Sequence, residues 1–362
     1  MTTTSERVSE ELTRQVSKVS QSVFDGSRLR VVLLVEVYDG AQQQFLEAYE
    51  QLCNQVASVP GHVSDQLCQS IENPSQWLIT SEWESAPPFL AWVNSEEHVR
   101  MVQPLHSCVR DTRSLRFHVV RETEGAAAGA EASSSQRRLQ TSPRIGDGVI
   151  RHALTFTVKP GSEAEVAKIL KNYSSPEARV DDTTRLCRTS LFMHGNRVVR
   201  AIEVRGDLMA ALRHVARQPE VRAVEEAINP YLEHDRDLDD QESARVFFTR
   251  AALPAVHHVT SGDQPEAERH ALCYPAKAGQ GMRLAELLAE ADELTADDQG
   301  SPVLRSTVFQ RDDVVVRLVD VHAGAGAVPV LPKAGRTAEV EKLLDGAAVR
   351  MELITDRRSP GA

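Results

Sequence analysis

Several features that mark common protein classes are scarce or missing in this sequence of 362 residues. Aromatic residues make up only 5%, and the formal net charge of −11 argues against a surface that binds nucleic acid. No apolar run approaches the roughly 20 residues of a membrane-spanning helix, and the start of the chain lacks the basic and apolar regions of a signal peptide. We therefore expect a cytoplasmic protein with neither a nucleic-acid nor a membrane partner.

Residues and motifs that usually hold cofactors are also rare. The cysteines are odd in number and lack paired spacing, which favours reduced thiols over disulfides or a thiolate metal site. They are Cys53, Cys68, Cys108, Cys187 and Cys273. The sequence has no Gly-rich phosphate loop, nucleophile elbow, zinc-binding His-Glu-x-x-His or dinucleotide fingerprint, and the pair His257-His258 has no third ligand beside it. We expect no metal and no bound cofactor.

What the sequence does contain is an internal repeat. Residues 151–154, Arg-His-Ala-Leu, return as residues 269–272. Further on, residues 188–192, Arg-Thr-Ser-Leu-Phe, correspond to residues 305–309, Arg-Ser-Thr-Val-Phe, with a shift of only one residue in between. A repeat at this distance predicts a duplicated structural unit.

The first copy shows the pattern of a ferredoxin-like unit. Apolar and polar residues alternate over residues 150–158, as in a half-buried strand, and a stretch of helical periodicity follows. Two strand-like runs, residues 186–193 and 198–204, flank a Gly-Asn turn typical of a hairpin. A second helix over residues 208–228 and a last strand at residues 245–248 complete the order β-α-β-β-α-β.

Two further units follow the same order. The second copy has a shortened second helix, and a third unit lies upstream. The predicted boundaries are a polar extension at 1–28, the upstream module at 29–122, a linker at 123–148, the repeats at 149–251 and 269–358, and a second linker at 252–268. We predict an α+β fold in which ferredoxin-like modules close into dimeric α+β barrels. Since three modules cannot all pair within one chain, we also expect a homodimer.

The upstream module carries a family resemblance. Its second hairpin strand reads Trp-Leu-Ile-Thr-Ser-Glu-Trp-Glu-Ser at residues 77–85, followed by Phe89, Trp92 and Ser-Glu-Glu-His at residues 95–98. With these features, residues 30–120 resemble the antibiotic biosynthesis monooxygenase family of small dimeric α+β barrels. The resemblance implies oxygenation of polyphenols without bound flavin or metal, while some relatives cleave haem and similar barrels act as polyketide cyclases.

Two departures weaken the haem interpretation. Haem-cleaving relatives pair an Asn on the first strand with a Trp and with a His about ten residues after that Trp. Here the first strand offers Val35, Glu36 and Val37, and the position ten after Trp92 is Val102.

The Arg-His-Ala-Leu phrases carry a second resemblance. Through them, residues 151–321 look like the SchA/CurD-like domain found in proteins of aromatic polyketide and spore-pigment pathways. This resemblance implies a pathway rather than a defined reaction.

Polar residues on the predicted strands are the candidates for chemistry, because such a barrel would enclose a chamber suited to a polycyclic aromatic ligand. His152 shares a strand face with Phe156, and its counterpart is His270. Each histidine is either a hydrogen-bonded residue inside an apolar layer or a base that takes the proton of a phenol. Arg200 and Arg317 either meet a carboxylate or hold an anionic oxygen in the chamber.

The remaining candidates could likewise have a structural role or a role in the chamber. Arg188 and Arg305 are expected to be mostly solvated. Trp77 and Trp83 share one strand face, as core packing or as a platform for an aromatic ring. His98 lies on a helix, either at the surface or at the mouth of the cavity.

We predict an oxygenase that hydroxylates an aromatic polyketide with molecular oxygen or converts its anthrone-type ring to a quinone. The predicted bases are His152 and His98, and Arg200 supports the anion. The predicted substrate-binding residues are Trp83, Trp77, Phe156, His270 and Arg317. A polyketide cyclase with the same chamber and a non-catalytic binding or scaffold subunit are the alternatives.

Overall fold

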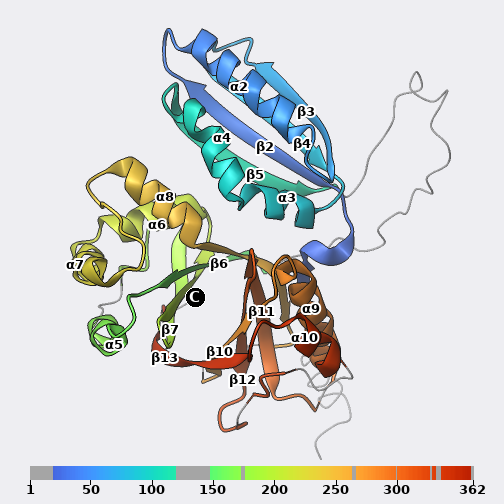
Figure 1. Cartoon of the computed structure of the whole chain (residues 1–362), viewed down its shortest axis with the longest axis vertical. Helices are drawn as coiled ribbons and strands as arrows, with labels where there is room; N and C mark the ends of the chain where they lie inside the picture. The colour runs from blue at the N-terminus through green and yellow to red at the C-terminus, as the bar shows by residue number, and fades with distance from the viewer. Residues whose placement is uncertain are drawn as a thin grey trace, which may run out of the picture. The chain divides into compact units, whose positions relative to one another are not determined.

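The computed structural model divides into two compact units (Figure 1). Unit 1 comprises Met1–Ser22 and Ile145–Ala362, and unit 2 comprises Val23–Arg144. The structure describes residues 19–119, 147–172, 176–262, 266–298, 300–326, 328–331 and 336–359. Most of the predicted extension and of the first linker therefore lies outside the described residues.

Unit 2 is a four-stranded antiparallel sheet in the order β3-β4-β2-β5, with helices on one face. Its elements are η1 (Val23–Asp25), β2 (Leu29–Val37), α2 (Gln42–Val56), β3 (His62–Gln69), β4 (Gln76–Trp83), α3 (Ala86–Val93), α4 (Glu96–His106) and β5 (Val109–His118). This matches the predicted order of the upstream module, with its second helix divided into α3 and α4.

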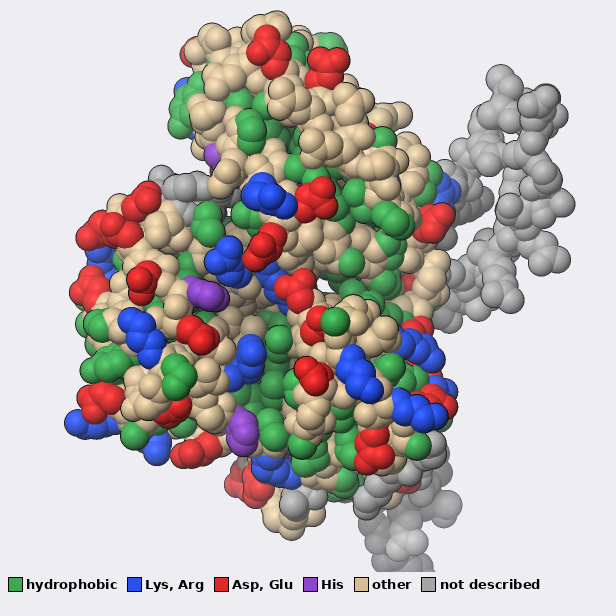
Figure 2. All heavy atoms as spheres, viewed as in Figure 1, with side chains coloured by type: hydrophobic (Ala, Val, Ile, Leu, Met, Phe, Trp, Pro, Cys, Tyr) green, Lys and Arg blue, Asp and Glu red, His purple; other side chains and the backbone are tan. Residues whose placement is uncertain are grey.

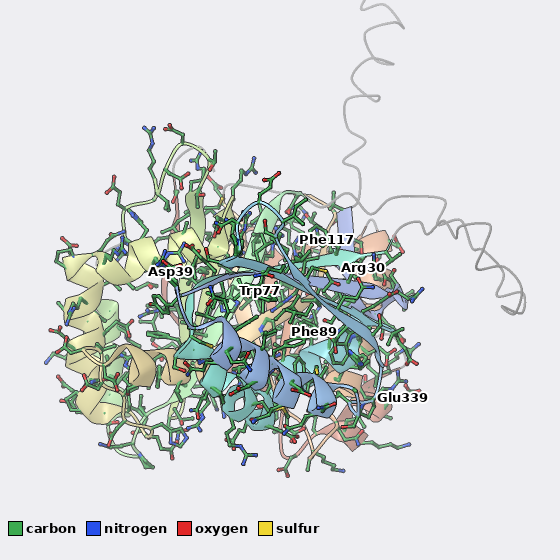
Figure 3. The ribbon with its side chains drawn as sticks, turned by 90° about the horizontal axis from the view of Figure 1, so that it is seen from above. Arg30, Asp39, Trp77, Phe89, Phe117 and Glu339 are labelled. Atoms are coloured by element: carbon green, nitrogen blue, oxygen red, sulfur yellow. The ribbon has the colours of Figure 1, made fainter. Side chains whose placement is uncertain are left out.

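The two faces of this sheet differ because side chains on a strand alternate between them. Val35 and Val37 of β2 are buried with Phe45 of α2 in the core beneath the helices. On the other face Leu34 and Phe117 are 42% and 51% exposed. Phe117 of β5 pairs with Arg30 of β2, and Figure 3 shows the two residues close together. Unit 2 therefore presents one sheet face without a covering layer from its own helices.

Unit 1 is a closed, antiparallel barrel. Its strands run β9-β11-β12-β10-β13-β7-β8-β6, and β6 pairs back to β9. The strands are β1 (Val19–Ser22), β6 (Val149–Thr157), β7 (Arg185–His194), β8 (Arg197–Arg205), β9 (Ala252–Thr260), β10 (Glu268–Pro275), β11 (Val303–Arg311), β12 (Val314–Val321) and β13 (Val349–Arg358). The predicted barrel is confirmed, and it closes within a single chain.

Helices cover the outside of this barrel (Figure 1). They are α5 (Glu163–Lys171), α6 (Leu208–Arg217), α7 (Pro219–Ile228), η2 (Asn229–Tyr231), α8 (Gln241–Ala251), α9 (Gly281–Asp297) and α10 (Thr337–Leu343). The apolar core inside the barrel includes Phe192, Phe309 and Leu318. On the face shown in Figure 2, acidic and basic side chains are interspersed. Within the described residues, every helix is too short or too polar to cross a membrane.

The end of the first half of the barrel differs from the prediction. A strand was predicted at residues 245–248 and a linker at residues 252–268, but the structure has helix α8 followed by strand β9. Phe247 and Ala251, one helical turn apart, pack in the cluster under α8. Pro254 is typical of a loop, but here it lies in strand β9. It pairs with β6, and the part of β9 that pairs with β11 begins at the next residue, Ala255. It therefore interrupts no hydrogen bond to β11.

The predicted polar extension also contains a strand. Val19–Ser22 forms β1, which pairs with residues 257–260 of β9. Strand β6 pairs with the earlier residues 252–254 of β9. Residues 1–28 were predicted only as a polar extension, so a strand at these four residues was not anticipated.

Candidate functional site

A network of buried ion pairs occupies the inside of the barrel in unit 1. Asp320 on β12 accepts a hydrogen bond from Arg269 Nε at 2.7 Å. The same carboxylate accepts from Arg188 Nη1 at 3.0 Å and from Arg305 Nε at 2.9 Å. Arg269 also contacts Glu203 of β8 at 2.5 Å, so the network joins the two halves of the barrel.

The charges of this network cancel. Arg151 pairs with Asp147 at 2.5 Å, and Arg188 also pairs with Asp356. Four arginines thereby meet four carboxylates. Burial alone would raise the pKa of Glu203, but the neighbouring arginines lower it to about 2. Because every charge is compensated, the network is suited to holding the barrel together.

His258 of β9 lies in the same interior. Its Nδ1 is 2.9 Å from Thr307 Oγ1, and its Nε2 is 3.9 Å from Asp147 Oδ2. Burial, with the charge of Arg151, lowers the pKa of His258 to about 3. The imidazole is therefore neutral at pH 7 and adds no charge to the balanced network.

The strand residues predicted to line a chamber lie instead on the outside of the barrel, beneath the helices. On β6 the interior positions belong to Arg151 and Ala153, so the alternation of the strand places His152 and Phe156 outside. The ring of Phe156 packs 6.2 Å from that of Phe247 on α8. The predicted placement of His152 and Phe156 in a chamber is therefore wrong.

The two outward arginines each meet a carboxylate from a covering helix. Arg200 pairs with Glu225 of α7 at 2.5 Å, and Arg317 Nε donates to Asp292 of α9 at 2.8 Å. This confirms the first of the two alternatives and contradicts the anion-holding one. His270 also lies on the outer face, with Nδ1 3.0 Å from a guanidinium nitrogen of Arg350.

The prediction for Arg188 and Arg305 is wrong as well, because both lie inside the barrel. They were expected to be solvated, but Arg188 is 3% exposed and the side chain of Arg305 is 14% exposed. Their strand positions face inward, where Asp320 compensates their charge.

Unit 2 holds a chain of aromatic rings with a histidine at each end. The ring of His62 lies 5.2 Å from that of Trp83, which stacks at 5.5 Å on Trp92. Trp92 in turn meets the ring of His98 edge to face at 4.3 Å. Phe89 lies 5.4 Å from Trp83. We call these five residues the aromatic cluster.

Helix α4 positions His98 in this cluster. Ser95 caps the helix, and its Oγ accepts a hydrogen bond from the backbone N–H of His98 at 3.1 Å. Among the described residues, neither His98 Nδ1 nor Trp92 Nε1 has a hydrogen-bond partner, although both atoms are buried. Burial, helped by the nearby His106 and Arg116, lowers the pKa of His98 to about 4. The ring is therefore neutral at pH 7.

His62 was not anticipated from the sequence. Its Nε2 lies 2.8 Å from Asp65 Oδ2, and burial raises the pKa of that carboxyl. In a regular strand, residues three apart point to opposite faces, so the spacing indicated no pair. The pairing register of β3 shifts between His62 and Ser64, and this irregularity brings the two side chains together.

The predicted tryptophan platform is mostly core. Trp83 is 0% exposed and Trp77 is 8% exposed, with the ring of Trp77 5.3 Å from that of Phe45. Trp77 is therefore core packing, as the first alternative predicted. Trp83 is buried beneath the partly exposed ring of Trp92 and stacks on it.

Comparison with known families agrees with the two-unit organisation. Residues 28–104 match the antibiotic biosynthesis monooxygenase family, and residues 149–261 match the SchA/CurD-like domain. The chain thus combines a domain of the first class with one of the second, and both resemblances are confirmed.

Curated relatives extend this over nearly the whole chain. Protein SchA of Streptomyces halstedii is 60% identical over 95% of this chain and 97% of its own. Polyketide synthase CurD of Streptomyces cyaneus is 58% identical over 94% of this chain and 97% of its own. The 42.8 kDa protein in the whiE locus of Streptomyces coelicolor is 58% identical over 100% of this chain and 96% of its own. The chain belongs to the SchA/CurD-like family.

Solved structures resemble a smaller part. SnoaB, a cofactor-independent oxygenase from Streptomyces nogalater, is 16% identical with a TM-score of 0.25, over 27% of this chain and 96% of that chain. A putative antibiotic biosynthesis monooxygenase from Bordetella bronchiseptica is 15% identical with a TM-score of 0.24, over 25% of this chain and 96% of that chain.

Proposed function

We propose that this protein oxygenates an aromatic polyketide without a bound cofactor and that the reaction takes place in unit 2. The observation that carries the proposal is the pair of buried nitrogens, His98 Nδ1 and Trp92 Nε1, which have no hydrogen-bond partner among the described residues. Buried polar groups are normally satisfied, so such a pair beside an aromatic surface indicates a place for a polar ligand. The monooxygenase-family match covers these residues, and the relatives' names support the polyketide class.

In the proposed reaction the substrate is its own reductant. An anthrone-type CH₂ group loses a proton and becomes an electron-rich anion that reacts with O₂. One oxygen atom remains on the ring as a carbonyl, and the other leaves as water with the two hydrogens of the CH₂ group. The balance requires no flavin or metal, only a base and a site that limits water.

The low pKa of His98 changes the role that we propose for it. A group of pKa about 4 is a poor acceptor for the proton of a phenol of pKa ~10, since a gap of roughly six units costs about 8 kcal/mol. We propose that His98 makes a hydrogen bond to a substrate oxygen and that Trp92 stacks on the rings. His62, oriented by Asp65, is the proposed base.

The test is oxygen uptake by purified, metal-stripped protein with an anthrone as substrate. We expect uptake without added flavin, haem or metal, and a product that has gained one oxygen and lost two hydrogens. Uptake that depends on an added cofactor would contradict the proposal. A product formed only by loss of water would indicate the cyclase instead.

A binding or scaffold role remains the second candidate, and one observation favours it for unit 1. The ionised groups inside the barrel neutralise one another, which suits a structural interior. If His98→Gln and His62→Gln left the product profile of the pathway unchanged while partner enzymes still co-purified with the chain, this role would replace the oxygenase for the whole protein.

We also propose a homodimer formed through unit 2. In unit 1 the two halves of the barrel cover each other's sheets, whereas the sheet of unit 2 exposes Leu34 and Phe117. A second copy would cover this face and close a barrel. Light scattering at micromolar concentration should give the mass of a dimer, and Leu34→Glu should give that of a monomer. A monomeric wild-type protein would contradict the proposal.

A further inference from the structure

A groove with a volume of ≈ 470 Å³ lies on the outer wall of unit 1. It runs between α5, the hairpin of β7 and β8, and β13, which lie near one another in Figure 1. Its apolar walls come from Ala164 and Ala167 of α5, Met193 of β7 and Ile354 of β13, and Arg350 also lines it. This volume falls in the range of small-molecule sites, roughly 300–1,000 Å³.

The other half of the barrel shows why the groove exists. By the register of the sequence repeat, Glu163 at the start of α5 corresponds to Gly281 at the start of α9. Gly281 approaches the β11–β12 hairpin so closely that an added Cβ would lie 1.9 Å from the carbonyl oxygen of Asp312. A residue with a side chain cannot make this approach. Glu163 therefore keeps α5 away from its hairpin.

The lengths of the two helices reinforce this difference. Helix α9 has 17 residues and packs along β11, where Asp292 accepts a hydrogen bond from Ser306 at 2.6 Å. Helix α5 has only 9 residues. Helix α9 therefore has a longer contact with its strands than α5 has.

Arg350 distinguishes this groove from a simple packing gap. Its guanidinium donates to His270 Nδ1 at 3.0 Å and to the carbonyl oxygen of Val328. Within the described part of the chain, no carboxylate pairs with Arg350, whereas Arg200 and Arg317 on the same outer face each have one. The neutral partners fix the guanidinium and leave its positive charge uncompensated.

The acidic residues at the rim set a limit on the ligand. Glu163 and Glu352 both line the groove, and Glu352 Oε1 lies 3.5 Å from Lys171 Nζ. A ligand with one anionic oxygen can place it on Arg350, but a second negative charge would meet these carboxylates.

We propose that the groove binds a flat, apolar molecule with a single anionic oxygen group, a phenolate or a carboxylate. Its rings lie between α5 and β13 against Ala167 and Ile354, and its oxygen accepts hydrogen bonds from Arg350. This site belongs to unit 1 alone, and its existence does not depend on oxygenation in unit 2.

The experiment is calorimetric titration of the full chain with anthraquinone-2-carboxylate. We expect binding to a site whose affinity falls at least tenfold in Arg350→Gln and less in Arg350→Lys, which retains the charge. Ala167→Leu should also weaken binding at least tenfold, because the larger side chain fills the groove. Glu165→Gln, on the solvent side of the same helix, is the control and should bind like wild type.

The uncharged analogue anthraquinone-2-methanol tests the role of charge. It should bind more weakly, and Arg350→Gln should not change its affinity. Thermal melting of each variant verifies that it is folded. Equal affinity for the carboxylate in wild type, Arg350→Gln and Ala167→Leu, or no binding to folded wild type, would overturn the proposal. Binding that is lost only with Trp92→Ala would place the probe in unit 2 and would also overturn it.

Discussion

The ion-pair network inside unit 1 and the aromatic cluster of unit 2 differ in how their polar groups are satisfied. Inside the barrel of unit 1, Asp320 accepts hydrogen bonds from three arginines, and each arginine of the network has a carboxylate. Inside unit 2, His98 Nδ1 and Trp92 Nε1 are buried among aromatic rings, and no described residue bonds to either. Ionisable residues in an interior therefore do not by themselves mark a site. In unit 2 the unsatisfied nitrogens coincide with a cluster of aromatic rings, and this combination marks it.

The energetics of burial explain the contrast. A buried charge is tolerated when a partner of opposite charge compensates it, and removing that partner costs several kcal/mol. An unsatisfied buried nitrogen costs about 1–3 kcal/mol, which a ligand that bonds to it can recover. The ion-pair network of unit 1 follows the first rule, and His98 Nδ1 and Trp92 Nε1 of unit 2 are exceptions to the usual satisfaction of buried groups.

The largest expected effect comes from breaking the network of unit 1. Asp320→Asn removes the charge that three arginines share, so we expect the free energy of unfolding to fall by about 3–5 kcal/mol. Calorimetric melting measures it, with Asp182→Asn at an exposed ion pair as the control. Since Trp77, Trp83 and Trp92 are the only tryptophans and all lie in unit 2, their fluorescence should melt nearly as in wild type. An unchanged calorimetric melt would contradict the structural role of the network.

Acid should destabilise unit 2 through His98. The pKa of His98 is about 4 in the folded state and ~6.5 when unfolded, so below pH 6.5 the unfolded chain takes up a proton that the folded one does not. Its contribution to stability is therefore lost as the pH falls from about 6.5 to 4, by at most about 3 kcal/mol. Tryptophan fluorescence during urea unfolding at several pH values measures this, and His98→Gln should remove that part of the slope. His118→Gln, at an exposed position, is the control.

The two helices α5 and α9 offer a matched pair of substitutions. Gly281→Ala places a Cβ against the carbonyl oxygen of Asp312, and we expect it to lower the stability of unit 1 by about 1–3 kcal/mol. Glu163→Ala at the corresponding position of α5 should change stability by less than about 0.5 kcal/mol. Chemical denaturation of both variants compares them directly. Equal effects would show that the two helix starts pack alike, contrary to the account of the groove.

The smallest effect is expected at the surface. Arg222 pairs with Glu226 at 2.8 Å and with Asp239 at 2.5 Å, but its side chain is 50% exposed. Exposed pairs are screened by water and contribute little, so the melting temperature of Arg222→Ala should stay close to that of wild type. A loss as large as that of Asp320→Asn would remove the distinction between buried and exposed charge pairs.

The fold could be predicted from the sequence because its signals are local. Alternation and turn residues located the strands β7 and β8 within a residue or two. The same alternation defines two faces of each strand without indicating which one points into the barrel. Helix α8 and strand β9 were missed because Phe247 and Phe248 look like strand residues while Pro254 looks like a loop residue.

The candidate site could be predicted only in part. The pairing of Arg317 with Asp292 joins residues 25 positions apart, and no pattern in the sequence indicates it. The pairing of His62 with Asp65 depends on an irregularity of β3 that the spacing of the two residues conceals. His98 was among the predicted candidates and stays one, but its low pKa results from burial, which the sequence does not show.

The central claim, that the chemistry belongs to unit 2 and the interior of the barrel in unit 1 is structural, is tested most directly by one pair of variants. His98→Gln and His258→Gln each replace a neutral histidine whose pKa is lowered by burial, one in each unit. Oxygen uptake with an anthrone should fall at least tenfold in folded His98→Gln and remain near wild type in folded His258→Gln. Loss of uptake in His258→Gln with normal uptake in His98→Gln would contradict the account.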